Sequence, residues 1–121
     1  RRFMKTFQAA AALVVMLVAP VFAPLTLAET AAEEGQRLFR EHCRHCHDDG
    51  SANGKYTPMT LIQAQWERFF DRKYERTHRK VKDDKYGSVP VTEAISSEVL
   101  EKIRDFAVDH AADTDQPMTC G

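Results

Sequence analysis

Apolar residues recur at helical spacing in separate stretches of the chain. Ahead of residue 43 the spacing i, i+3, i+4 and i+7 joins Gly35, Leu38, Phe39 and His42. Near the carboxyl end the same spacing joins Val99, Leu100, Ile103, Phe106, Ala107 and His110. No internal repeat and no strand-like alternation of useful length is present. The pattern therefore predicts an all-α fold, with one helix at each end of the folded part.

The middle of the chain predicts another helix followed by a charged stretch. Thr57 and Pro58 favour a helix start, because threonine caps free amides and proline fits the first helical position. The apolar residues of this helix fall on one stripe, Ile62, Trp66, Phe69 and Phe70. From 71 to 92 the hydrophobic period disappears, and we expect a charged loop or a frayed helix end. Thr92 or Ser96 then caps the last helix.

Residues 1–28 have the pattern of an export signal. Arg1, Arg2 and Lys5 precede an uncharged stretch, whose apolar centre at 9–19 is shorter than the roughly 20 residues that span a bilayer. Small residues favour cleavage after Ala28. We expect a periplasmic or otherwise exported domain at 29–121, without stable membrane insertion after cleavage. An uncleaved membrane anchor is the alternative.

Charge excludes one class of partner. The chain has 17 basic and 18 acidic residues. Removing the signal takes three bases and no acids, which leaves 14 against 18 and a net charge of −4 for 29–121. A mildly acidic domain argues against nucleic acid as a partner and suits contacts with other proteins.

Cys43, Cys46 and His47 form the motif C-x-x-C-H. In an exported chain this is the attachment signature of a c-type haem, in which two thioethers and a proximal histidine hold one covalent cofactor. A thioredoxin-like redox site is the first alternative, but it expects a βαβ setting. Half of a zinc site is the second, but the pair that would complete a tetrahedron is missing. A simple disulfide is the third.

The chain resembles the small monohaem cytochromes c of class I. The resemblance rests on the C-x-x-C-H motif and on two helix patterns, which comprise Gly35, Leu38, Phe39, Leu100, Ile103, Phe106 and Ala107. It implies a small cytochrome c-like helical domain in which the first and last helices cross, with Gly35 against Phe106. It also implies one covalent haem c, with Cys43 and Cys46 as thioethers and His47 as the proximal iron ligand. Candidate haem-packing residues are Phe39, Trp66, Phe70 and Phe106.

The sequence leaves the sixth iron ligand open. Class I cytochromes usually supply a methionine from the loop before the last helix, but 71–92 contains no methionine and does contain His78. Met59, beside Pro58, has the chemistry expected in the family. Met118 and His110 are further candidates, and a five-coordinate iron would need no sixth ligand. The choice matters because a thioether raises the reduction potential and a second imidazole leaves it lower.

The resemblance implies a one-electron carrier between redox partner proteins rather than an enzyme. A haem-based sensor or minor catalyst with an open sixth site, and a haem subunit of a larger oxidoreductase, are the alternatives. The basic residues between Arg72 and Lys85 are a candidate docking surface for an anionic partner. Cys120 is left over from the motif, so an intermolecular disulfide to a second copy or a partner is a further expectation.

Overall fold

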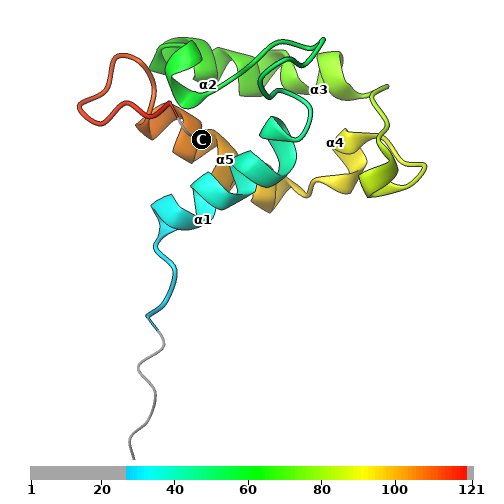
Figure 1. The fold of residues 1–121 in the computed structure, drawn as a ribbon, viewed down its shortest axis with the longest axis horizontal. Coiled ribbons are helices and arrows are strands. Elements are labelled where there is room, and N and C mark those ends of the chain that lie inside the picture. The colour runs from blue at the N-terminus through cyan, green and yellow to red at the C-terminus, as the bar shows by residue number, and fades with distance from the viewer. Residues whose placement is uncertain (1–26, 120–121) are drawn as a thin grey trace, which may run out of the picture.

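The structure is a computed structural model that describes residues 27–119, and the elements of this part are helices joined by loops (Figure 1). The all-α prediction is therefore confirmed. Most of the expected export signal, residues 1–26, and Cys120 lie outside the described residues. Within 27–119, no helix has the length and apolar character that crossing a membrane requires.

Helix α1 (Ala31–Leu38) begins at a capping box. The Thr30 hydroxyl accepts the Glu33 backbone N–H at 3.2 Å, and the Glu33 carboxylate accepts the Thr30 backbone N–H at 2.8 Å. The helix continues directly into η1 (Phe39–Arg44), a π-helical turn that carries the first cysteine. Such turns are rare in proteins, and many of those known occur at functional sites.

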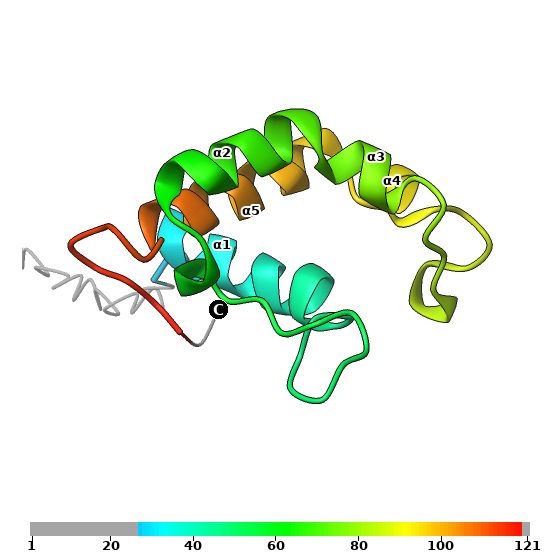
Figure 2. The same ribbon diagram turned by 90° about the horizontal axis from the view of Figure 1, so that it is seen from above.

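Helix α5 (Ser97–Asp109) crosses α1, as Figures 1 and 2 show. Ser96 caps it by accepting the Val99 N–H at 3.2 Å, which confirms one of the two expected caps. At the crossing, a Cβ placed on Gly35 would lie 2.6 Å from Cβ of Phe106. The expected contact between these two residues is thus present, and only glycine allows the backbones to approach this closely.

The second predicted helix starts later than expected. Thr57 and Pro58 open a short 3-10 turn, η2 (Pro58–Thr60), and α2 (Gln63–Arg72) begins afterwards. The expected charged loop is then interrupted by α3 (Tyr74–His78). Sequence reading missed α3 because its exposed face is dense in charge, whereas within the helix only Tyr74 and His78 are half-buried. Figure 2 shows α2 and α3 along one side of the molecule, opposite α1 and η1.

A looped segment joins α3 to the last helix. It contains η3 (Asp84–Tyr86) and α4 (Val91–Ala94). Its base is closed by an isolated bridge between Lys82 and Pro90. The core lies where α1, η1, α2 and α5 meet, and its buried members are Leu38, Phe39, Trp66, Ile103, Phe106, Ala107 and Ala111.

Candidate functional site

A cavity of about 620 Å³ lies between the two sides of the domain. Cofactor sites typically have volumes of about 300–1,000 Å³ and mostly apolar walls. The wall on one side comes from η1 and the C-x-x-C-H motif, and the wall on the other comes from α2 and α3. The aromatic and aliphatic residues that line the whole cavity are Phe39, Tyr56, Leu61, Trp66, Phe69, Phe70, Tyr74, Val81, Tyr86, Val91 and Ile95.

Both motif cysteines line this cavity as free thiols. Burial raises the pKa of the Cys43 thiol to about 12, and burial also raises the pKa of Cys46. A thiol-disulfide catalyst needs a lowered pKa, because the thiolate is its nucleophile. The shift in both thiols is in the opposite direction, which argues against the thioredoxin-like alternative. The paired thiols in a cofactor-sized cavity fit the two attachment points of a c-type haem.

His47 lines the cavity directly after the second thiol. Its Nδ1 lies 3.1 Å from the Asn53 carbonyl oxygen and 3.2 Å from that of Gly54. Because a carbonyl only accepts, Nδ1 carries the proton and Nε2 keeps a lone pair that a metal can take. The Tyr56 ring lies edge-on to the His47 ring at 4.9 Å. This arrangement orients the imidazole as histidine ligands are usually oriented in metal proteins.

His78 is held in the same way on the opposite wall. Its Nδ1 lies 3.0 Å from the Tyr74 carbonyl oxygen and 2.8 Å from the Thr77 hydroxyl. Donation to the carbonyl again leaves Nε2 as the nitrogen with a lone pair. Burial lowers the pKa of His78, which favours the neutral imidazole that metal binding requires. The Tyr74 ring stacks on the imidazole at a centroid distance of 4.9 Å.

The ring centroids of His47 and His78 lie 6.2 Å apart. A metal lies about 2.0 Å from an imidazole nitrogen and about 1 Å further from the ring centre, so two imidazoles on opposite sides of one ion have centroids about 6 Å apart. The observed spacing fits that value. The residues present therefore fit a haem iron with two histidine ligands, in a cavity that both thiols of the motif also line.

The remaining candidate ligands lie away from the cavity wall. The Met59 side chain is 38% exposed on η2, and the Met118 sulfur accepts a hydrogen bond from the Gln36 amide at 3.3 Å. His110 is buried in the core, where its Nδ1 lies 2.8 Å from the Gln116 carbonyl oxygen. None of the three is among the cavity-lining residues. Of the sequence candidates, His78 alone is brought opposite His47.

Three of the four candidate packing residues line the cavity. Phe39 and Trp66 contact each other edge to face at 6.3 Å, and Phe70 stacks on Trp66 at 5.9 Å. Trp66 is fixed by its indole N–H, which donates to the Pro58 carbonyl oxygen at 2.7 Å. Phe106 packs against Phe39 from the core side and does not line the cavity. It supports the wall from behind.

Sequence reading missed Tyr74 and Thr77. Tyr74 lies four residues before His78, so both fall on one face once 74–78 is recognised as a helix. The Tyr74 hydroxyl is buried and has no hydrogen-bond partner within residues 27–119, and burial raises its pKa to about 12. A buried hydroxyl without a partner is costly. Its place in the cavity wall is consistent with a site built around an occupant.

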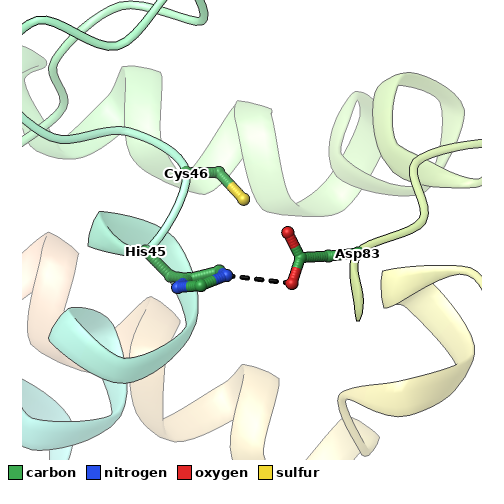
Figure 3. A group of neighbouring side chains, drawn as sticks. All are labelled: His45, Cys46 and Asp83. Carbon is green, nitrogen blue, oxygen red and sulfur yellow. Dashed lines mark hydrogen bonds and ion pairs between the residues drawn. The ribbon is translucent and has the colours of Figure 1, made fainter. Parts of the chain in front are cut away.

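His45 and Cys46 of the C-x-x-C-H motif form a polar group with Asp83. His45 Nε2 lies 2.9 Å from an Asp83 carboxylate oxygen, and the Cys46 sulfur is close to both (Figure 3). The three candidate ligand atoms lie within 4.8 Å of one another. With a free thiolate, this group has donors for a zinc-like cation. That use of Cys46 and a thioether at Cys46 are mutually exclusive.

Comparison with known proteins found no match. No protein-family model matches the chain, no curated protein is significantly similar to it, and no solved structure matches it.

Proposed function

We propose that this protein binds one covalent c-type haem in the cavity and carries single electrons between redox partner proteins. The observation that carries the proposal is the opposition of His47 and His78 across the cavity, at 6.2 Å between ring centroids. The Cys43 and Cys46 thiols in the same wall support it, because they precede His47 with the spacing of the attachment motif.

Each side chain has a definite part in this proposal. Cys43 and Cys46 would hold the group covalently, and His47 and His78 would bind its iron. When bound, the group supplies a one-electron redox centre. Ligands held by their own backbone contacts keep one geometry in both oxidation states, which suits electron transfer. Two imidazoles also place the reduction potential below that of a histidine and methionine pair.

Export and partner docking belong to the same proposal. The signal-like pattern at 1–28 supports delivery to the periplasm or an equivalent compartment. Lys73 lines the cavity and belongs to the row of exposed basic side chains that runs from Arg72 to Lys85. A basic surface at the edge of the cavity suits a small, short-lived contact with an anionic redox partner.

The test is spectroscopic. The full chain is produced in cells that attach haem to exported proteins, and the purified protein is compared with the variants His78→Ala and Met59→Ala. We expect a covalent haem and a low-spin spectrum in the parent, a high-spin spectrum in His78→Ala, and no change in Met59→Ala. Met59→Ala is the matched control, because its side chain lies outside the cavity wall.

Three different outcomes would replace the proposal. Protein without haem but with one zinc ion, lost in Asp83→Asn, would assign the motif to a cation site at His45, Cys46 and Asp83. Prompt binding of carbon monoxide to the reduced parent would instead favour a haem sensor or minor catalyst with a weakly held sixth ligand. A low-spin His78→Ala together with a high-spin Met59→Ala would transfer the ligand role to the methionine.

A further inference from the structure

Side chains of residues 83–86 contact η1 and the residue that follows it, His45. Asp83 pairs with His45 at 2.9 Å, as Figure 3 shows. The Tyr86 hydroxyl lies 2.6 Å from Nδ1 of His42, and the two rings stack with an interplanar angle of 20°. The Lys85 ammonium donates to the Glu41 carbonyl oxygen. These contacts join segments about forty residues apart in the sequence.

Val81, two residues before this segment, is hydrogen-bonded to His78 and to Val91. The Val81 N–H donates to the His78 carbonyl oxygen at 2.9 Å, and the Val81 carbonyl accepts the Val91 N–H at 2.9 Å. Within residues 83–86, the Asp83 carboxylate accepts the Lys85 backbone N–H at 2.8 Å, and this bond fixes the conformation of the turn. Only residues 79–82 separate His78 from Asp83 along the chain, so the position of residues 83–86 limits where the end of α3 can lie.

Helix α3 needs such support because it is only five residues long. A single turn and a half has little stability of its own. Helix α3 packs on α2 and α4, whereas His47 lies across the cavity, on the side of η1 and the C-x-x-C-H motif. Besides the cavity occupant itself, the contacts of 83–86 form a direct connection between the His78 segment and the His47 segment.

We propose that Asp83 and Tyr86 are positioning residues that hold His78 opposite His47 through a clasp. The clasp consists of the contacts of Asp83 with His45 and of Tyr86 with His42 of η1. The inference rests on the proposed haem ligation by these two histidines. Opening of the clasp would let α3 move away and uncover the iron to an external ligand. The clasp therefore keeps the protein an electron carrier rather than a ligand binder.

The experiment compares the parent with Asp83→Asn/Tyr86→Phe and with the control Asp84→Asn. Asp84 is the exposed neighbour of Asp83 and carries the same charge. We expect the rate of carbon monoxide binding to the reduced double variant to rise about tenfold, because weakening two hydrogen bonds of roughly 1 kcal/mol each by a total of about 1.4 kcal/mol corresponds to that factor. The Asp84→Asn variant should bind carbon monoxide at the parental rate. The single variant Asp83→Glu, which keeps a carboxylate, should bind it nearly as slowly as the parent.

A second readout does not depend on the iron. Amide hydrogen exchange in residues 79–87 should become faster in the double variant, while exchange in α5 stays unchanged. Parental rates in both measurements would overturn the clasp. If the double variant folds poorly, the single variant Tyr86→Phe gives the same comparison. A low-spin His78→Ala would instead defeat the proposed ligation, so the two failures are distinguishable.

Discussion

His78 is supported at the scale of single residues by its own helix as well as by the clasp. The Tyr74 carbonyl accepts from Nδ1 at 3.0 Å, and the Tyr74 ring lies nearly parallel to the imidazole, at an angle of 22°. The carbonyl contact survives any substitution at 74, whereas the stacking depends on an aromatic ring. The two contributions are therefore separable by mutation.

Tyr74→Leu should loosen the proposed sixth ligand, His78, and Tyr74→Phe should not. Loss of an aromatic contact of about 0.5–1.5 kcal/mol predicts a roughly two- to tenfold faster binding of carbon monoxide. The measurement is stopped-flow mixing of the reduced variants with carbon monoxide. Equal rates in Tyr74→Leu and the parent would show that the ring has no part in holding His78.

Helix crossing is the main device at the scale of elements. Gly35 of α1 meets Phe106 and Lys102 of α5, and an added Cβ would lie 2.6 Å from the Phe106 Cβ and 3.1 Å from the Lys102 carbonyl oxygen. Both of these atoms belong to or adjoin the backbone, so neither can swing aside. The crossing places α1, and with it the C-x-x-C-H motif, against the rest of the core.

Gly35→Ala should destabilise the domain by about 1–3 kcal/mol, because the methyl group overpacks the crossing. Alanine is otherwise the better helix former by about 1 kcal/mol, so the steric cost outweighs a favourable term. The measurement is chemical denaturation followed by circular dichroism. Ala64→Gly, at an exposed site in α2, measures the propensity term alone. A more stable Gly35→Ala would contradict the observed packing.

Charge is unevenly distributed at the scale of the whole molecule. Residues 29–121 carry a net charge of −4, but 72–85 contains seven basic and three acidic residues. This segment is therefore +4, and the remainder is −8. Lys73 and Arg68 bring positive charge to the cavity wall itself. A small redox reagent approaching the cavity meets a field opposite in sign to the net charge.

Electron exchange with hexacyanoferrate, an anion, should therefore slow as salt is added. Net charge alone would predict the reverse, because screening relieves repulsion between two anions. Raising the ionic strength from roughly 10 mM to about 150 mM shortens the Debye length from about 30 Å to about 8 Å, enough to screen this local attraction. The measurement is the second-order rate constant across that range. A rate that rises with salt would remove the basic segment as a steering surface.

Local chemistry and periodicity carry much of the sequence-based prediction. Both end helices and the Ser96 cap were predictable, because each depends on neighbouring residues or on a helix face. The Gly35–Phe106 contact was expected only from the resemblance to a known family. The motif at 43–47 likewise needs no tertiary information. The expected start of the second helix was wrong, and the segment expected to be a charged loop or a frayed helix end contains the separate helix α3. Helix α3 shows no clear hydrophobic period, because its inward face contacts a cavity rather than a continuous core.

Only the tertiary structure decided which side chain faces His47. Sequence alone left His78, Met59, Met118 and His110 as candidates, since position along the chain does not determine distance in space. The fold places His78 at 6.2 Å and leaves the other three outside the cavity wall. Asp83 and Tyr86 were beyond prediction for the same reason, because their partners lie about forty residues away. Long-range packing, rather than local pattern, determines the site opposite the motif.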